Sequence, residues 1–304
     1  MTTMVLLLVI QLMLLLIVAF LLYERNMQGR QNKIQLEHIY EQIEKKSIQI
    51  TDSINYAKRI QESILLPQED MQKIFPESFV FFKAKDVVSG DFYWISVHGD
   101  KVIIAVADCV GHGVPGAFMS MIGNTLLNQI VNEKEVMLPN EILRQMNSAI
   151  VKSLHQANSN SQNQTQDDGM DVSLCIFDRK TRELQFSGAN HSVFLINNNK
   201  LEVVRGELFA IGGFAKNVQK EFITHTMTLE PDTYIYMFSD GFHDQFGGPG
   251  PSRKKFMSVR FKELILGMHR LPMAKQRQKI ESELISWQGK QSQTDDIVVM
   301  GIKV

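Results

Sequence analysis

The sequence predicts an α+β fold, in which helices stack on mostly antiparallel sheets, behind an N-terminal membrane helix and a helical linker. Residues 4–22 are almost wholly apolar, and residues 31–66 are polar and contain neither glycine nor proline. The remaining residues alternate groups of short strand signals with helical signals in pairs, a pattern typical of this fold class. We therefore expect a transmembrane helix at residues 4–23, a helical coiled-coil linker at residues 31–66 and one domain at residues 67–304.

Charge and cysteine usage narrow the class of protein. The 304 residues include 32 basic and 33 acidic side chains, a net charge of −1. A nucleic-acid binder usually carries a basic surplus, so we expect no nucleic-acid partner. The two cysteines, Cys109 and Cys175, form no CxxC pair, which fits a reducing compartment. One isolated disulfide remains the alternative.

The apolar run at residues 4–22 is long enough for a bilayer. Nineteen helical residues at ~1.5 Å each span ~28 Å, close to the hydrocarbon thickness. A signal peptide is the main alternative, but no Lys or Arg precedes the run and FLLY at residues 20–23 is a poor cleavage site. Arg25, Arg30 and Lys33 follow the run, so the positive-inside rule predicts that the rest of the chain is cytoplasmic.

Residues 31–66 carry a heptad pattern. One apolar seam recurs every seven residues: Leu36, Ile43, Ile50, Ala57 and Ile64. A second seam, with Ile39 and Ile60, is interrupted by Lys46 and Ser53. One good seam and one poor seam indicate a coiled coil of modest stability, and a homodimer through residues 36–64. The alternative is a solvated helix that packs on its own domain. Pro67 ends the helix.

Strands dominate the rest of the chain. We expect strands at residues 79–85, 92–97, 101–107, 170–177, 184–187, 193–196, 201–204, 222–229, 234–238 and 297–304. The second and third of these form a hairpin around residues 98–100. We expect helices at residues 116–131, 141–156, 256–268 and 274–287. Loops are predicted at residues 158–168 and 247–250, and a turn at residues 197–199.

A motif at residues 106–113, VADCVGHG, is the centre of the predicted site. The apolar run at residues 102–107 leads directly into Asp108, which places a carboxylate at the end of a buried strand. Gly111 and Gly113 let the backbone turn sharply after it.

More aspartates stand beside apolar strand signals. Asp91 follows VSG at residues 88–90, Asp240 follows the run at residues 234–239, and Asp295 and Asp296 precede the run at residues 297–300. A single such aspartate is most often a turn former or a helix cap. Several in one cleft repel unless a cation is present, and carboxylate oxygens are the ligands that Mg²⁺ and Mn²⁺ prefer. We expect these aspartates to hold two divalent cations that activate a water against a phosphate ester.

Other hydrolytic signatures are missing from the sequence. No arginine follows Cys109 to bind phosphate, and Cys175 lies in an apolar run that is typical of a buried thiol. The chain contains no GxSxG, HExxH or Walker A motif. A mechanism without a side-chain nucleophile is therefore favoured.

Five motifs together resemble those of a known family. They are VSGDFY at residues 88–93, ADCVGHG at 107–113, GMD at 169–171, SDG at 239–241 and TDD at 294–296. In this order and spacing they resemble the SpoIIE/RsbU-type bacterial serine phosphatases, which belong to the metal-dependent, type 2C-like (PPM) superfamily. The resemblance covers residues 64–304. It implies an αββα sandwich, with two antiparallel sheets flanked by helices and a dimanganese or dimagnesium site at one end.

The resemblance also implies roles for single residues. Asp91 and Asp108 become metal ligands, with Asp108 bridging the two ions. The remaining ligands implied by the motifs are the backbone carbonyl of Cys109, Asp240 and Asp295.

Four further positions carry more than one interpretation. Asp296 is expected beside the ligands, with Asp295 preferred as the ligand itself. Asp171 matches a further metal position, and the alternative is an ordinary strand-edge aspartate. His112 is a candidate acid for the leaving seryl oxygen or a turn histidine held by backbone. Lys85 is a candidate for phosphate binding, in place of the arginine of related phosphatases, or a surface lysine.

The expected activity is that of a metal-dependent protein serine/threonine phosphatase in the bacterial inner (cytoplasmic) membrane, single-pass, with its catalytic domain in the cytoplasm. The resemblance implies a phosphoserine or phosphothreonine on a small partner protein, commonly an anti-sigma-factor antagonist. The alternative is a catalytically silent, phosphatase-like binding module that sequesters a phosphorylated partner.

Overall fold

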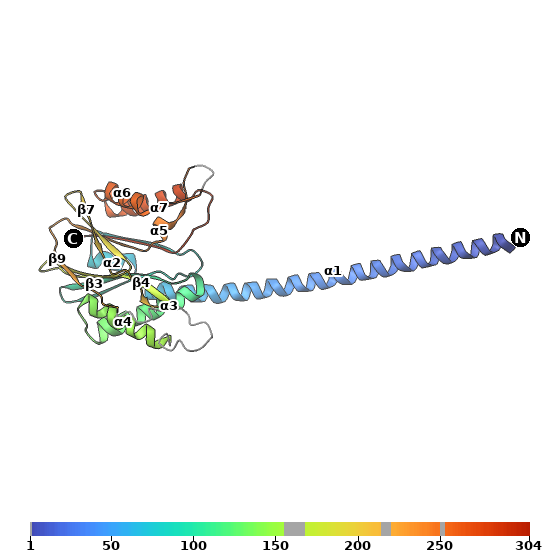
Figure 1. Cartoon of the computed structure of the whole chain (residues 1–304), viewed down its shortest axis with the longest axis horizontal. Coiled ribbons are helices and arrows are strands. Elements are labelled where there is room, and N and C mark those ends of the chain that lie inside the picture. The colour runs from blue at the N-terminus through green and yellow to red at the C-terminus, as the bar shows by residue number, and fades with distance from the viewer. Residues whose placement is uncertain (1, 155–167, 214–219, 250–252) are drawn as a thin grey trace. The chain divides into compact units, whose positions relative to one another are not determined.

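The computed structural model describes residues 2–154, 168–213, 220–249 and 253–304, which form two compact units, Met1–Tyr56 and Ala57–Val304 (Figure 1). Most of the loop predicted at residues 158–168 lies outside the described residues. Each unit is considered by itself below.

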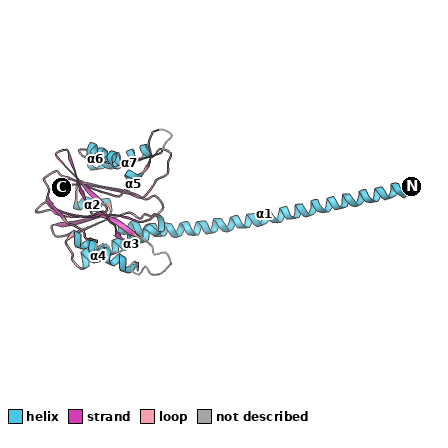
Figure 2. Cartoon of the chain, in the orientation of Figure 1, coloured by secondary structure: helices cyan, strands magenta, loops and turns pink. Residues whose placement is uncertain are grey.

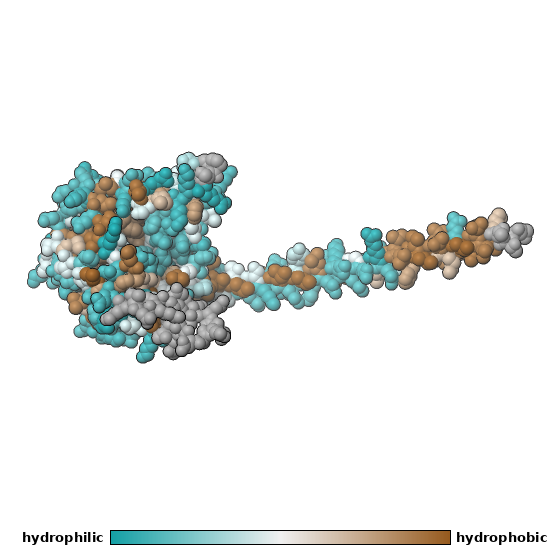
Figure 3. Space-filling view, viewed as in Figure 1, coloured by the Kyte–Doolittle hydropathy of each residue, from teal (hydrophilic) through white to brown (hydrophobic). Residues whose placement is uncertain are grey.

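The first unit is a single helix, the part of α1 (Thr2–Ile64) that precedes residue 57. Its large apolar side chains from Met4 to Tyr23 are each between 50 and 66% exposed. Apolar side chains cover most of this segment on the face that Figure 3 shows. By length and composition this segment suffices to cross a membrane. The helix continues through residues 24–30, so the predicted apolar helix and the predicted linker helix are one uninterrupted element. Of the first heptad seam, Leu36, Ile43 and Ile50 are exposed.

The second unit begins with the last two turns of α1, residues 57–64. Pro67 follows with a φ of −59° and precedes the short helix α2 (Gln68–Ile74), which the sequence pattern did not predict. The helix therefore ends before the proline, as predicted.

This unit contains two large antiparallel sheets (Figure 2). The first has the order β1 (Ser78–Lys83), β13 (Ile297–Lys303), β10 (Tyr234–Phe238), β6 (Ser192–Asn197) and β7 (Lys200–Arg205). The second has the order β2 (Phe92–His98), β3 (Lys101–Cys109), β4 (Gly169–Asp178), β5 (Glu183–Ala189) and β9 (His225–Thr228), with β8 (Ile211–Gly212) paired to β4. The predicted hairpin at residues 92–107 is confirmed, with Phe92 opposite Ala107.

The main core lies between the two sheets. Alternate side chains along each strand point into it. On β10, Ile235 and Met237 are buried in a cluster that also contains residues of the second sheet. The alternate residues Tyr236 and Phe238 belong to a separate aromatic cluster with Phe261. Successive side chains of a strand point to opposite faces, so β10 contributes to both clusters.

Helices cover each sheet on its other side. α3 (Gly113–Leu127), continued by the π-helical turn η1 (Asn128–Glu133), and α4 (Pro139–Ser153) contact the second sheet. α5 (Gly241–Asp244), α6 (Ser258–Met268) and α7 (Met273–Gln288) contact the first sheet. The fold is thus a mixture of helices with two antiparallel sheets, as the sequence predicts.

Several predicted boundaries are wrong. The strand predicted at residues 222–229 begins only at His225, because Phe222 leaves the strand path and its ring packs on Phe209 at 5.2 Å. Phe246–Gly247, within and just before the predicted loop, forms β11 and pairs with β12 (Lys254–Lys255). Residues 128–131 of the predicted helix are π-helical rather than α-helical.

Candidate functional site

Strand register brings three aspartates of the second sheet together. Asp91 directly precedes β2, and Phe92 pairs with Ala107, so Asp91 lies beside the end of β3. On the other side of β3, Asp108 pairs directly with Asp171 of β4. An antiparallel pair places these side chains within a few ångströms of each other. One end of this sheet therefore gathers three carboxylates.

The first sheet contributes its aspartates at the same end of its own central pair. Phe238 pairs with Val299, so Asp240, which follows β10, lies beside Asp295 and Asp296, which precede β13. The chain is close-packed here, because a Cβ atom on Gly241 would collide with the carbonyl oxygen of Asp296. Electrostatic interactions link Asp91 to all three of these aspartates, so the two sheets contribute to one acidic cluster.

Asp91 is one of two fully buried members of the acidic cluster, with Asp296. Each is 2% exposed, and the Oδ2 atom of Asp91 has no hydrogen-bond partner among the described residues. Burial is the main cause that raises the pKa of Asp91 well above its usual value, and repulsion by Asp296 and Asp295 adds to it, against a hydrogen bond with Ser239. A buried carboxylate oxygen without a partner is costly, which indicates a site that accepts a proton or a cation.

Asp108 and Asp240 join the cluster from the two sheets. Burial, followed by repulsion from Asp91 and Asp240, raises the pKa of Asp108 well above its usual range. Burial, followed by repulsion from Asp244, also raises the pKa of Asp240. The carboxylates of Asp108 and Asp240 thus interact across the two sheets. A proton or a cation bound between them would relieve their repulsion.

Asp296 has a different environment from its neighbour Asp295. Its Oδ1 accepts a hydrogen bond from the backbone N–H of Lys85 and its Oδ2 accepts one from Gly90, both at 2.7 Å. Its carboxylate thus fixes the loop that leads to Asp91. For the side chain of Asp295, the one hydrogen bond found among the described residues is accepted by Oδ1 from the backbone N–H of Asp296, at 2.9 Å. This difference favours Asp295 over Asp296 as the side chain free to bind an ion.

Gln61, which the sequence analysis did not single out, also holds the loop that leads to Asp91. The Gln61 amide donates to the carbonyl oxygen of Ser89 at 2.6 Å and to Ser120 Oγ at 2.9 Å, and its Oε1 accepts from the N–H of Ser89 at 3.0 Å. Gln61 is 4% exposed. Its neighbours on the helix give no sign of this role, because its partner Ser89 is 28 residues away in the sequence.

The remaining predicted residues have distinct surroundings. The carbonyl oxygen of Cys109 packs against Gly90, while burial raises the pKa of the Cys109 thiol well above its usual value, which disfavours a thiolate nucleophile. Asp171 accepts a hydrogen bond from Asn190, and burial raises its pKa to about 6. For Lys85, the contact with the cluster comes from its backbone N–H.

His112, the other residue of uncertain role, lies at the start of α3. Its Nδ1 atom is 2.5 Å from Oδ2 of Asp86, and both side chains are about half exposed. Its side chain makes no cap hydrogen bond to the helix. His112 therefore pairs with a carboxylate outside the buried cluster.

The carboxylates lie near one another but are not arranged as a closed metal site. Across the described residues, no three His, Cys, Asp or Glu side chains stand at the distances that a single ion needs. The donor chemistry nevertheless fits hard cations, because all six members of the cluster offer carboxylate oxygens: Asp91, Asp108, Asp171, Asp240, Asp295 and Asp296. Five of the six have a raised pKa, with burial as the first cause and neighbouring negative charge as a further one.

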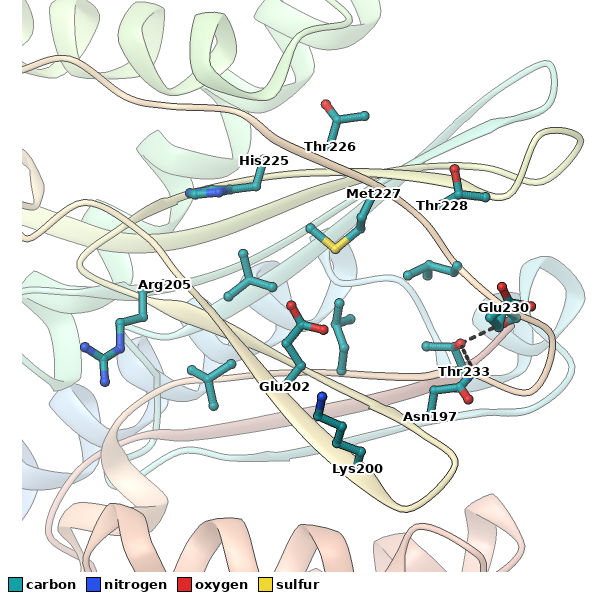
Figure 4. A pocket seen from close by; sticks show the side chains of 14 residues that line it. Asn197, Lys200, Glu202, Arg205, His225, Thr226, Met227, Thr228, Glu230 and Thr233 are labelled. Atoms are coloured by element: carbon teal, nitrogen blue, oxygen red, sulfur yellow. Dashed lines mark hydrogen bonds between the residues drawn. The ribbon is translucent and has the colours of Figure 1, made fainter.

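A groove elsewhere in the domain is separate from this chemistry. It has a volume of about 720 Å³ and lies between the edge strands β7 and β9 (Figure 4). Lys200, Glu202 and Arg205 line it from β7, and Met227 from β9. None of the aspartates of the acidic cluster lines it, so its size does not make it the reaction site.

Comparisons with known proteins agree with this fold. The family model for stage II sporulation protein E (SpoIIE) matches residues 98–304. The SiaA-PP2C domain of Pseudomonas aeruginosa is 30% identical, with a TM-score of 0.75, over 85% of this chain and 98% of that one. The PP2C phosphatase domain of SpoIIE from Bacillus subtilis, solved with a fragment of its regulatory domain, is 18% identical with a TM-score of 0.59, over 75% of this chain and 63% of that one. RsbX in complex with magnesium is 16% identical, with a TM-score of 0.50, over 75% of this chain and 94% of that one. A search of curated proteins found no match.

Proposed function

Because this chain belongs to the SpoIIE family of PP2C-type serine/threonine phosphatases, we propose that it hydrolyses phosphoserine or phosphothreonine on a partner protein with the help of two divalent cations. The observation that carries the proposal is the convergence of carboxylates from two sheets around the buried Asp91, whose Oδ2 has no partner in the part of the chain that the structure describes. A phosphatase-like fold without catalysis would have no need of such a costly arrangement.

The residues that would hold the ions are Asp91, Asp108, the carbonyl of Cys109, Asp240 and Asp295. Asp171 is proposed for a further ion, and Asp296 for fixing the loop that carries Asp91. Mn²⁺ and Mg²⁺ both suit an all-oxygen donor set, and the related RsbX was solved with magnesium. Bound there, such ions would lower the pKa of a water for attack on phosphorus and neutralise the phosphoryl oxygens.

The chain's own groups would complete the reaction. His112 is the candidate that gives a proton to the leaving seryl oxygen, because its imidazole lies on the exposed rim four residues after Asp108. Lys85, next to Asp86 on the loop that leads to Asp91, is the candidate that binds a phosphoryl oxygen. The burial of Asp91 and Cys109 would keep bulk water away from the floor of the site.

Membrane attachment and partner choice belong to the same proposal. The apolar residues 4–23 would anchor the chain in the bacterial inner membrane as a single span, with Arg25, Arg30 and Lys33 on the cytoplasmic side. The catalytic domain, residues 67–304 in a four-layer αββα sandwich, would then meet a cytoplasmic phosphoprotein. An anti-sigma-factor antagonist is the partner we propose.

The linker would join two copies of the chain. The exposed seam residues Leu36, Ile43 and Ile50 would pack against the same residues of a second copy, in a parallel coiled coil. Since Gln61 lies on the same helix and binds the loop beside Asp91, packing of the linker would bias the geometry of the site.

The test is turnover of a phosphoserine peptide by the full-length chain in detergent, with Mn²⁺ and with a chelator. We expect hydrolysis that requires Mn²⁺ and is lost in Asp108→Asn. A folded wild-type protein that binds the phosphorylated partner but hydrolyses nothing in Mn²⁺ or Mg²⁺ would favour the silent binding module instead.

A further inference from the structure

Asp86 and His112 form a pair that joins the two loops of the candidate site. Asp86 Oδ2 lies 2.5 Å from His112 Nδ1, although the residues are 26 positions apart. Asp86 belongs to the loop between β1 and β2 that also carries Asp91, and His112 follows Asp108 by four residues. The side chains are 49% (His112) and 46% (Asp86) exposed, so the pair lies on the rim of the acidic cluster and not within it.

The backbone around the pair is closely packed, so its position is well defined. A Cβ atom on Gly90 would lie 2.5 Å from the carbonyl oxygen of Gly111, which means that the two loops meet backbone to backbone. Gly113 has a φ of +65°, and a Cβ atom there would lie 3.2 Å from Asp86 Oδ2. Glycine at residue 113 therefore gives the Asp86 carboxylate room beside the imidazole.

The hydrogen bonds of the His112 imidazole involve only one of its two ring nitrogens, which leaves the other for a ligand. Asp86 occupies Nδ1, the ring makes no cap bond to α3, and among the described residues no protein partner is found for Nε2. Since a carboxylate only accepts, Nδ1 must be the donor, in the neutral and in the protonated ring alike. The bond therefore fixes the ring orientation and turns Nε2 away from Asp86.

We infer that Asp86 is a positioning residue for the reaction: it orients His112 so that Nε2–H faces the leaving oxygen of the phosphoester. This inference rests on the proposed phosphatase function. An ordinary surface ion pair of this exposure contributes little to stability, so a role in stability alone would leave activity nearly unchanged.

The proton balance is complete without another reactant. Water forms the new bond to phosphorus, the bond from phosphorus to the seryl oxygen breaks, and Nε2–H of protonated His112 gives its proton to that oxygen. His112 then regains from solvent a proton equivalent to the one that the attacking water released. Asp86 keeps its hydrogen bond to Nδ1–H throughout and is never protonated, as the carboxylate that orients a catalytic imidazole need not be.

Two substrates with different leaving groups test the inference in the full-length protein with Mn²⁺. A seryl oxygen leaves poorly without a proton, whereas p-nitrophenolate leaves readily without one. We expect Asp86→Ala to lower kcat for a phosphoserine peptide by roughly 10²-fold, in the range of general-acid effects, with KM nearly unchanged. We expect kcat for p-nitrophenyl phosphate to fall by less than about threefold, and Asp86→Asn, which retains an acceptor, to restore part of the loss.

Controls separate this effect from damage to the fold. Asp100→Ala removes another exposed aspartate, in the turn between β2 and β3, and is expected to change neither substrate. Mn²⁺ affinity by calorimetry is expected to be equal in Asp86→Ala and wild type. A readout independent of turnover is the ¹⁵N spectrum of His112 in the metal-free protein, assigned with His112→Gln. The wild type is expected to carry the Nδ1–H form and Asp86→Ala to lose that preference.

The outcomes are distinguishable. An equal loss on both substrates, no loss on either, or an unchanged His112 tautomer in Asp86→Ala would overturn the role of Asp86 while leaving the phosphatase intact. A wild-type protein that turns over neither substrate would overturn the proposed function, and this inference with it.

Discussion

The side-chain amide of Gln61 bonds to both backbone polar groups of Ser89, two residues before Asp91. It donates to the carbonyl at 2.6 Å and accepts from the N–H at 3.0 Å. Ser89 in turn accepts a hydrogen bond from the N–H of Asp91 through its Oγ atom, at 3.0 Å. The last turns of α1 are thus connected to a predicted metal ligand through a chain of buried hydrogen bonds.

Gln61→Leu is therefore expected to weaken the site. Leucine is close in size but removes both bonds to Ser89. The buried N–H of Ser89 loses its partner, at a cost of about 1–3 kcal/mol, and the carbonyl keeps only a long bond from Ser120 Oγ, at 3.4 Å. We expect metal affinity and phosphopeptide turnover each to fall by roughly tenfold or more. Calorimetry with Mn²⁺ measures the first. Gln42→Leu, an exposed position on the same helix, is the matched control and is expected to have no effect. Equal behaviour of the two variants would contradict the connection.

Asp295 and Asp296 are expected to respond differently to the same substitution. Asp296 accepts hydrogen bonds from two backbone N–H groups, so Asp296→Asn, which keeps one acceptor oxygen, should destabilise the domain by about 1–3 kcal/mol. Asp295→Asn should barely change stability but should reduce Mn²⁺ affinity. Thermal denaturation without metal and calorimetry with metal give the two readouts. If Asp296→Asn alone lost metal affinity, the assignment of the two residues would be reversed.

Gly241 is expected to tolerate no side chain. A Cβ atom there would overlap the carbonyl oxygen of Asp296, and the backbone must move to relieve the contact. Gly241→Ala should therefore cost about 1–3 kcal/mol and spread Asp240 from Asp295, lowering Mn²⁺ affinity. Gly267→Ala is the control, because a Cβ atom at that α6 position meets nothing within 4 Å. The control should stabilise the protein by up to ~1 kcal/mol, since alanine favours a helix.

The buried carboxyls should destabilise the metal-free domain as the pH rises. Burial first, and repulsion second, raise the pKa values of Asp91 and Asp108 in the folded state. For Asp171, burial raises the value to about 6, from ~3.9 in an unfolded chain. At these carboxyls the folded state binds more protons than the unfolded state, so their contribution to the unfolding free energy falls with rising pH. The buried His191 and His243, whose pKa values burial lowers, contribute in the opposite direction. For Asp171 the fall begins near pH 4 and is complete just above pH 6.

Thermal denaturation in a chelator between pH 4.5 and 7.5 measures this effect. We expect the Tm difference between saturating Mn²⁺ and chelator to widen as the pH rises, because bound cations replace protons at the carboxyls. The histidines affect both conditions alike, so they cancel in this difference. A difference that stays constant over the range would mean that these carboxylates are not held in mutual repulsion.

The sequence predicted the elements that depend on local patterns. The hairpin at residues 92–107 follows from alternating side chains around a Gly-Asp turn, and its register carries Asp91 to Asp108. The α+β class and the family resemblance are also confirmed. Phe222 shows where such patterns fail: it is apolar like a strand residue, but it packs on Phe209 outside the strand.

Contacts between distant segments left no local signal. Gln61 looks like any polar residue of a solvated helix, and its partner Ser89 is 28 positions away. The pairing of Asp86 with His112 is similarly remote. Two neighbouring aspartates, Asp295 and Asp296, differ only in which backbone N–H groups reach them, and that depends on the packing of a loop from the other end of the domain.

The central claim is that carboxylates from both sheets bind two divalent cations, and calorimetric titration of the full-length protein with Mn²⁺ tests it most directly. We expect two ions per chain for the wild type. Asp108→Asn, which removes the proposed bridging ligand, should bind at most one, weakly, and should be more stable than the wild type in a chelator because it lacks one repelling charge. A folded wild-type protein that binds no Mn²⁺ or Mg²⁺ would contradict the claim.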